Sequence, residues 1–362
     1  MTRSRNLLAA FAAMLLGALL SAASPAFGAD FSGKRIEFVI PFGTGGGSDV
    51  WARFLAPRLS EALPGKPVVA VRNEPGGGSI TGTNQFAARA RPDGLTILGT
   101  SGSTQFPYLL GDPRVKYDYK DWTVILATPT GGVVYAQPDL GAKSADEVMK
   151  LKGKRLVYGS QGATSLDLVV PLAFEILGLD LQVVFGMKGR GPARLAFERG
   201  ESTVDYQTTA AYLQSVEPLV KAGNAVPLWA WGTINEQGEL VRDPTFPDLP
   251  HFGEVYEKVH GRKASGTGWN AWKSFFVAGF AAQKMVFLPK GTPKDIVDTY
   301  RQAVARMVAA PDFKDAAQQA LGEFDQGIGP RAERLAELAT GVDPEARAFV
   351  RDWLTRKYNV KF

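Results

Sequence analysis

The chain has 362 residues and contains no cysteine, so disulfide bonds, thiol nucleophiles and cysteine-ligated metal centres are excluded. Its formal charge of +5 comes from 41 basic and 36 acidic side chains that form no block of like charge, which argues against nucleic acid as a partner. The length suggests two lobes rather than one, with a core large enough to make disulfides unnecessary.

The N-terminus has the three parts of a secretory signal. Arg3 and Arg5 give a positive start, residues 7–20 are apolar and uncharged, and small residues follow up to Gly28. The apolar stretch is shorter than the roughly 20 residues that span a bilayer. We therefore expect cleavage between Gly28 and Ala29 and an exported mature protein that does not span the membrane. An uncleaved membrane anchor is the alternative.

The first third of the chain has the order strand, glycine-rich turn, helix, strand. Residues 36–40 are an apolar, β-branched run that is typical of a strand, and the turn Phe42 to Gly47 follows. Ser48 or Asp49 then caps a helix. Further strands are expected at residues 67–71 and 95–98.

The same order returns in the middle of the chain. A strand at residues 155–158 leads into the polar turn Gly159 to Thr164, and Ser165 caps the next helix. This order is typical of parallel sheets with right-handed crossovers, so we expect an α/β fold with two similar halves. The other expected elements are strands at 182–185, near Val204 and at 228–231, helices at 192–199 and 210–222, and a mostly helical segment from 293 to 358.

Two segments are candidates for the connections between the halves. Residues 122–136 look like one strand continuing into another, and the polar segment 233–268 is rich in glycine and proline. We expect one lobe to comprise residues 29–128 plus 250–362 and the other residues 129–249, with hinges near 125–132 and 233–268.

Two of the turns have the properties of an anion-binding site. Each lies between a strand and a helix, where backbone N–H groups at the positive end of the helix dipole attract carboxylate or phosphate. Ligands in open α/β sheets bind at the carboxyl ends of the strands, so the two turns are expected to face each other across a cleft. The candidate residues are Phe42, Gly43, Thr44, Gly45, Gly46, Gly47, Ser48 and Asp49 in the first turn and Ser160, Gln161, Gly162, Ala163, Thr164 and Ser165 in the second.

Other chemically suggestive groups are weaker candidates. The run from Pro75 to Gly82 resembles an anion-binding nest, but turn formation explains its glycines more simply. His251 and His260 lack metal-ligand spacing and are expected at the surface. No nucleophile or acid–base motif stands out, so we expect no catalytic residue, metal site or cofactor. We expect Lys188, Arg190 and Arg194 to lie on a solvated loop and helix face. At most, their positive charges would steer an anion toward the protein.

An ordered set of short motifs runs through most of the mature chain. The motifs are Pro41-Phe42, Gly45-Gly46, Ser48-Asp49 and Ala52-Arg53, then Asn73, Pro75, Gly76, Gly78, Gly82 and Thr83, the run Pro92 to Leu98, Tyr117-Asp118 to Trp122, Tyr158-Gly159-Ser160 and Leu288-Pro289-x-Gly291-Thr292-Pro293. Together they resemble the Bug family, the periplasmic substrate-binding proteins of tripartite tricarboxylate transporters.

The resemblance implies a two-lobed periplasmic-binding-protein fold of the Venus flytrap type (type II), in which each lobe is a mixed sheet flanked by helices. It implies that a ligand carboxylate is held between the first turn, with Ser48 as the main hydroxyl, and the second turn. It also implies a monomer in the periplasm that passes a small organic carboxylate to a two-component integral membrane transporter. Further ligand contacts are implied for Ser101, Ser103, Gln207 and Thr208.

The chain also departs from the family pattern. Gly43 replaces the usual proline of the first turn, Leu168 replaces a common histidine, and the segment from His251 to Trp269 looks longer than usual. The part of the pocket that holds the ligand's other end is therefore expected to differ, which leaves diacids, citrate, aromatic acids and amino acids open. The alternative functions are an exported lyase or hydrolase acting on a small organic acid, and a ligand sensor for a membrane receptor.

Overall fold

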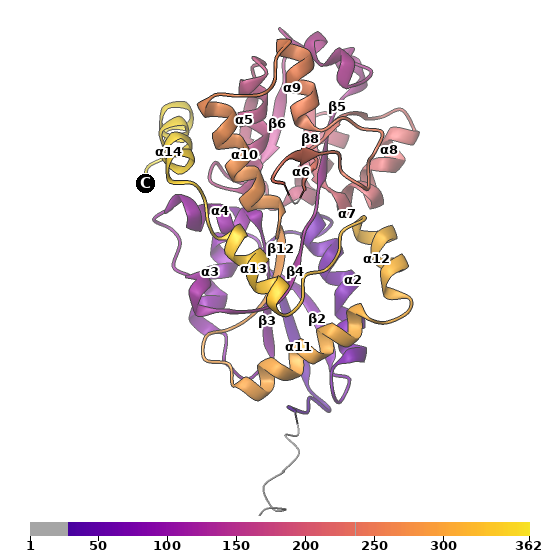
Figure 1. Cartoon of the computed structure of the whole chain (residues 1–362), viewed down its shortest axis with the longest axis vertical. Coiled ribbons are helices and arrows are strands. Elements are labelled where there is room, and N and C mark those ends of the chain that lie inside the picture. Colours follow the sequence, from indigo (N-terminus) through magenta and orange to yellow (C-terminus); the bar gives the residue numbers. More distant parts are fainter. Residues whose placement is uncertain (1–27, 236) are drawn as a thin grey trace, which may run out of the picture.

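The computed structural model describes residues 28–235 and 237–362; residues 1–27, which hold almost all of the expected signal peptide, lie outside the described residues. Two five-stranded sheets form its framework, one above the other in Figure 1. The first sheet consists of β1 (Arg35–Ile40), β2 (Val68–Asn73), β3 (Thr96–Ser101), β4 (Thr123–Thr128) and β12 (Lys284–Leu288), in the order β2-β1-β3-β12-β4.

The second sheet repeats this arrangement. It consists of β5 (Gly132–Ala136), β6 (Val157–Ser160), β7 (Gln182–Phe185), β8 (Val204–Thr208) and β9 (Val226–Ala230), in the order β7-β6-β8-β5-β9. Each sheet contains three parallel strands, and the middle one of the three is β1 or β6. One further strand in each sheet runs antiparallel to both of its neighbours: β12 lies between β3 and β4, and β5 lies between β8 and β9. The expected α/β fold with two similar halves is confirmed. A short antiparallel ribbon joins β10 (Thr233–Ile234) and β11 (Leu240–Val241).

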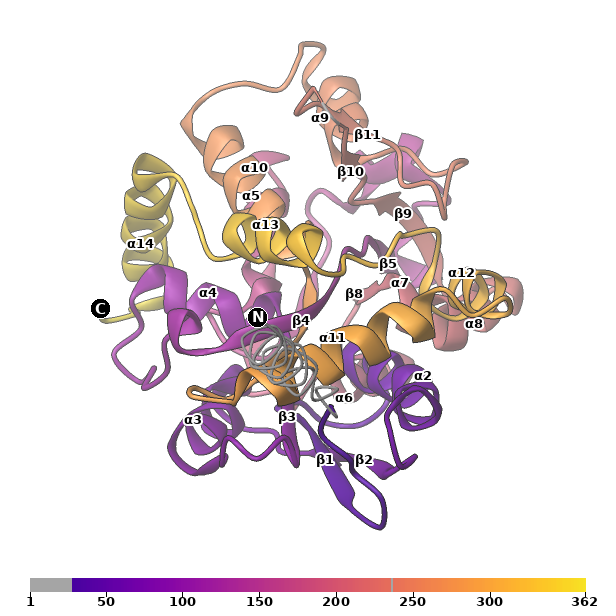
Figure 2. The same ribbon diagram turned by 60° about the horizontal axis from the view of Figure 1, so that its bottom comes forward.

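Helices flank both sheets. On the first sheet's side these are α2 (Gly47–Ala62), α3 (Ile80–Arg89), α4 (Gly102–Leu110), α11 (Lys294–Val308), α12 (Phe313–Leu321) and α13 (Pro330–Ala339). On the second sheet's side these are α5 (Val169–Ile176), α6 (Arg190–Glu198), α7 (Thr209–Ala211), α8 (Glu217–Lys221), α9 (Phe252–His260) and α10 (Thr267–Phe280). In Figure 2, α11 crosses the lower half of the molecule, where it packs on α2 and β4. Within the described ranges, the helices are all too short or too polar to cross a bilayer.

The chain changes sheets twice. It leaves the first sheet after Thr128 and enters the second at Gly132, within the expected range 125–132. It returns between Phe280 and Lys284, which is C-terminal to the expected range 233–268, because α9 and α10 still pack on the second sheet's side. We propose that the lobes divide at these two crossings. The last helix, α14 (Pro344–Tyr358), packs on α10 and contacts α4, so it touches both lobes.

Local structure differs from the sequence prediction in two informative places. The single helix expected at 210–222 is broken by a wide π-helical turn, Tyr212–Val216, because Pro218 has no backbone N–H to continue the helical ladder. His260 is exposed as expected, but His251 is half-buried. The reason is that His251 caps α9, where its Nδ1 accepts a hydrogen bond of 3.3 Å from the Glu254 backbone N–H.

Candidate functional site

A small cavity lies between the two sheets, where β1, β3, β6 and β8 end. It encloses about 20 Å³, which is room for about one water molecule. Because parallel strands of both lobes point their carboxyl ends at it, the residues that follow these strands meet there. The lining comprises Phe42, Gly43, Gly46, Gly47, Ser48, Asp49, Ser101, Ser103, Gln161, Leu166, Arg190, Tyr206, Thr208 and Gln283.

The cavity lining includes most of the candidate residues of the first turn and of the ends of β3 and β8, but only Gln161 of the six candidates in the second turn. Candidates outside the lining have other contacts: Thr164 bonds to Asp112, and the amide of Gln207 donates 2.7 Å to the carbonyl oxygen of Arg190. Ser165 caps the turn after β6, since its hydroxyl accepts a hydrogen bond from the backbone N–H of Asp167. The candidates outside the lining are Thr44, Gly45, Ser160, Gly162, Ala163, Thr164, Ser165 and Gln207.

The first turn is held in shape by the carboxylate of Asp49. One carboxylate oxygen accepts from the backbone N–H of Gly45 at 2.9 Å, and the other accepts from Arg53 and from Asn73, each at 3.0 Å. Gly45 has a φ of +75°, which glycine adopts without strain. This bracing directs the N-terminus of α2, with Gly47 and Ser48, toward the cavity. The positive end of the helix dipole therefore lies at the cavity wall.

The two lobes touch directly across the cavity. The hydroxyl oxygen of Ser103 accepts from the side-chain amide of Gln161 at 3.2 Å and from the backbone N–H of Leu166 at 3.3 Å. At the cavity wall, the backbone N–H of Gly43 donates to the carbonyl oxygen of Lys188 at 2.6 Å. The structure is thus a closed form. A ligand larger than about one water requires the lobes to move apart.

Arg190 is buried, which corrects the expectation of a solvated helix face. Its guanidinium contacts the carboxylates of Asp167, at 3.2 Å, and Asp205, and donates to the carbonyl oxygen of Gly159 at 2.7 Å. It also lies over the ring of Tyr206, 4.8 Å from the centroid. Because a buried cation needs full pairing, this network fixes the floor of the second lobe's half of the cavity.

Sequence reasoning also missed the pair Gln283 and Lys284. Gln283 lines the cavity, and Lys284 is only 2% exposed at the start of β12. Burial lowers the pKa of Lys284 to about 7. The available signal was a lysine that directly precedes the apolar run 285–288, which is unusual for a strand between two neighbours.

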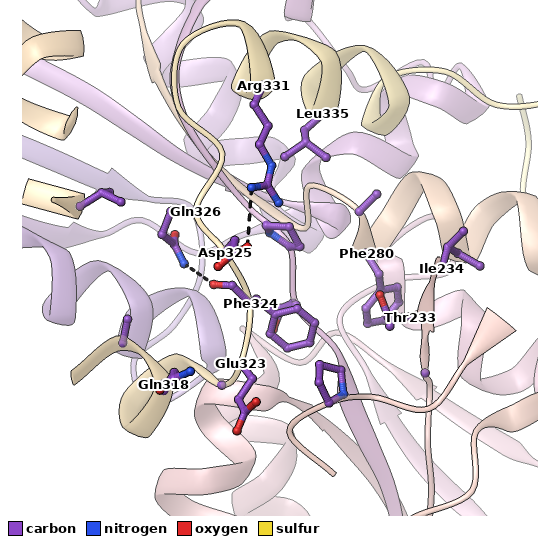
Figure 3. Close-up of a pocket in the computed structure, with 18 of the residues that line it drawn as sticks. Thr233, Ile234, Phe280, Gln318, Glu323, Phe324, Asp325, Gln326, Arg331 and Leu335 are labelled. Carbon is purple, nitrogen blue, oxygen red and sulfur yellow. Dashed lines mark hydrogen bonds and ion pairs between the residues drawn. The ribbon is translucent and has the colours of Figure 1, made fainter. Parts of the chain in front are cut away.

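A larger cavity of about 630 Å³ lies elsewhere between the lobes and shares no lining residue with the first (Figure 3). The segment from Gly322 to Gln326 and the side chains of Phe280 and Ile234 line it. Its ion pair joins Arg331 to Asp325 at 3.8 Å, and both side chains are at least half exposed. The smaller cavity is the stronger candidate, because buried hydroxyls, a helix N-terminus and the buried cation Arg190 line it, and the buried Lys284 lies beside its lining residue Gly47.

Comparisons with known proteins agree with this geometry. The family model described as tripartite tricarboxylate transporter family receptor matches residues 51–327. A UPF0065 protein of Bordetella pertussis is 30% identical over 303 residues, which cover 82% of this chain and 83% of that protein. The solved structure of the periplasmic binding protein BugD is similar with a TM-score of 0.66 at 23% identity, and covers 90% of this chain and 98% of its own.

A further solved structure, a Rhodopseudomonas palustris protein with adipate, is similar with a TM-score of 0.67 at 20% identity, covering 91% of this chain and 99% of its own. These structural likenesses confirm the fold expected of a periplasmic binding protein. The family match covers well over half of the chain and includes the ends of β3, β6 and β8, while the first turn lies just before its first matched residue. The chain therefore belongs to the family of tripartite tricarboxylate transporter receptors.

Proposed function

We propose that this protein is a periplasmic solute-binding protein that captures a small organic carboxylate between its lobes and delivers it to a tripartite tricarboxylate-type membrane transporter. The observation that carries the proposal is the convergence of four strand ends and the N-terminus of α2 on one buried cavity between two sheets. Backbone N–H groups and hydroxyls at such a position suit a carboxylate. The adipate held by a relative of the same fold supports this ligand class.

The hydrogen bonds between the lobes support a capture mechanism. In the closed form, Ser103 and Gln161 bond to each other, so both polar groups are satisfied when the lobes meet. Separation of the lobes exposes these groups and the first turn to solvent. A carboxylate that enters then bridges the two turns and favours closure, and the transporter reads the closed state.

The proposal is tested with the mature protein, starting at Ala29, in a thermal-shift screen against mono-, di- and tricarboxylates. A ligand at one hundred times its Kd stabilises the fold by about 2.7 kcal/mol, which is a readily measured shift. The acid is then followed by proton NMR in the presence of the protein. We expect one acid class to stabilise the protein and to persist unchanged. If no acid shifts the transition, the proposal is wrong.

The two alternatives give different results in the same samples. An exported enzyme consumes the stabilising acid, whereas a binding protein leaves it intact. A ligand sensor also binds without turnover, but in solubilised membranes it captures a receptor and not a two-component transporter. Pull-down with the ligand-loaded protein distinguishes these last two functions.

The site within the protein is tested by Ser48→Ala. Ser48 lies at the N-terminus of α2 and lines the cavity, so loss of its hydroxyl is expected to remove about one neutral hydrogen bond to the ligand. We expect the Kd to rise about 2- to 12-fold while the fold stays intact. Ser60→Ala, at the other end of the same helix, is the control and leaves the Kd unchanged.

A further inference from the structure

Lys284 begins its strand at the edge that faces the candidate cavity. β12 runs antiparallel to β3, and Lys284 is paired with Ser101, the last residue of β3. The start of one strand and the end of its neighbour therefore coincide. The side chain is 2% exposed, so its charge lies inside the protein.

The ammonium group lies beside Gly47, at the N-terminus of α2. A Cβ atom placed on Gly47 would lie 3.5 Å from Nζ of Lys284 and would overlap the Thr208 hydroxyl oxygen at 1.8 Å. The ammonium of the first lobe and the hydroxyl of the second lobe thus flank the same backbone position. Gly47 and Thr208 both line the cavity.

Both of these polar groups have hydrogen-bonding capacity that the described part of the chain does not use. Lys284 donates to the side-chain oxygen of Gln283, which is a neutral partner. Among residues 28–235 and 237–362, the Thr208 hydroxyl has no hydrogen-bond partner, although the residue is 3% exposed. A buried ammonium without a carboxylate is costly, so an anion at this position would satisfy both donors.

The charged residues of the cavity lining, Asp49 and Arg190, are already paired, whereas Lys284 lies beside the lining residue Gly47. Asp49, on α2, pairs with Arg53 at 3.0 Å, and Arg190, on α6, is held by Asp167 and Asp205. Gly47, Thr208 and the helix N-terminus contribute only partial charges. Among the described residues around this site, Lys284 therefore carries the full charge that has no carboxylate partner.

We propose that Lys284 is the counter-ion of the ligand: its ammonium and the Thr208 hydroxyl hold one carboxylate group of the ligand against the N-terminus of α2. This role rests on the proposed function. It adds a preference for negatively charged ligands that the two turns alone do not provide. It restricts the site to acids that are ionised at the end that enters the cavity.

The test compares Lys284→Met with Lys290→Met by titration calorimetry, using the acid that stabilises the wild-type protein best. Loss of a charge-assisted hydrogen bond is expected to weaken binding by Lys284→Met about 10- to 100-fold. Lys290 is exposed and pairs with Asp121, so Lys290→Met is the matched control and leaves the Kd unchanged. Without ligand, Lys284→Met is expected to melt no lower than the wild type, because it removes an unpaired buried charge.

A second measurement on the wild-type protein decides the matter if Lys284→Met does not fold. Since burial lowers the pKa of Lys284 to about 7, a bound carboxylate must restore its charge at pH 8. Calorimetry in buffers of different ionisation enthalpy is expected to show uptake of about one proton per ligand. The affinity is expected to fall about tenfold for each pH unit above 7.

The outcomes separate this inference from the proposed function. If the wild type binds an acid, but Lys284→Met binds it equally well or no proton is taken up, the role of Lys284 is wrong and the proposed function stands. If the wild type binds no carboxylate, both are wrong. A weaker Kd together with proton uptake supports both.

Discussion

The hydroxyl of Thr164 donates a hydrogen bond of 2.8 Å to the carboxylate of Asp112, and this bond joins the turn after β6 to the loop after α4. Arg114 pairs with the same carboxylate at 2.6 Å and lies 3.4 Å from the Thr164 hydroxyl. The contact therefore bridges the two lobes outside the cavity lining. Since it joins residues of both lobes, we expect it to break when the lobes separate and so to contribute to the equilibrium between open and closed states.

Thr164→Val is expected to weaken ligand binding without unfolding the protein. The substitution removes one hydrogen bond to a charged group, which contributes about 1.5 to 3 kcal/mol, while Arg114 still satisfies Asp112. We expect the Kd to rise by about tenfold or more. Titration calorimetry measures the change, and Thr203→Val, far from the lobe contact, is a control for the loss of a hydroxyl. An unchanged Kd would mean that this contact does not favour closure.

Gly47→Ala is expected to keep the lobes apart. The new methyl group would lie 1.8 Å from the Thr208 hydroxyl oxygen, which is too close for two atoms that are not bonded. The backbone of Gly47 is ordinary helix, so alanine itself adds no backbone strain there. We expect a large loss of affinity and a larger radius of gyration in small-angle scattering, with little change in melting temperature. Gly162→Ala, on the facing turn, has open space within 4 Å and is the matched control. Normal binding by Gly47→Ala would contradict the closed geometry.

Arg190→Met is expected to destabilise the fold, not merely to weaken binding. It would leave Asp167 and Asp205 buried without their cation, which costs about 3 to 5 kcal/mol. Arg194→Met is the control on the same helix, because its partner Glu198 is partly exposed and the pair contributes about 1 kcal/mol or less. Urea denaturation of both variants checks the difference. If both variants unfold at the same urea concentration, the buried network of Arg190 does not stabilise this part of the second lobe.

The contribution of Asp243 to the unfolding free energy is expected to fall as the pH rises from about 4 to about 6. Burial raises the pKa of Asp243 to about 6, so the folded chain keeps a proton that the unfolded chain has already lost. The sign follows from proton linkage, and the loss amounts to about 3 kcal/mol at most. The pH range lies below the pKa of Lys284, so that residue does not contribute to it.

Asp243→Asn isolates this effect. The asparagine oxygen can still accept the hydrogen bond from the backbone N–H of Thr245, while the charge is removed. We expect the variant to be more stable than the wild type by about 1 to 3 kcal/mol at pH 8 and equally stable at pH 4. Asp248→Asn, at an exposed site, serves as control. The assignment fails if the stability gain does not depend on pH.

The sequence predicted the parts of the site that depend on local order. The first turn and the turn after β6 lie between a strand and a helix, and the carboxyl ends of parallel strands bring them together whatever the side chains are. Gly47, Ser48 and Gln161 were found in this way. Their role as ligand contacts is still a prediction.

The missed residues depend on contacts between distant segments. Arg190 looks like an ordinary helix-face arginine until β6 and β8 bring Asp167 and Asp205 to its guanidinium. Gln283 lines the cavity and Lys284 lies beside Gly47 only because the chain returns to the first sheet with β12 paired to β3. The pattern of residues 233–268 suggested an earlier return, since it does not reveal that α9 and α10 pack on the second sheet's side.

The most direct test of the account is a crystal structure of the mature protein with the acid that stabilises it best. We predict that one carboxylate of this acid lies between the lobes, within hydrogen-bonding distance of Gly47, Ser48 or Ser103, with both lobes in contact with the ligand and farther apart than in the present structure, whose cavity holds about one water. A ligand bound instead in the cavity lined by Phe280 and Phe324, or no ligand between the two turns, would contradict the central claim.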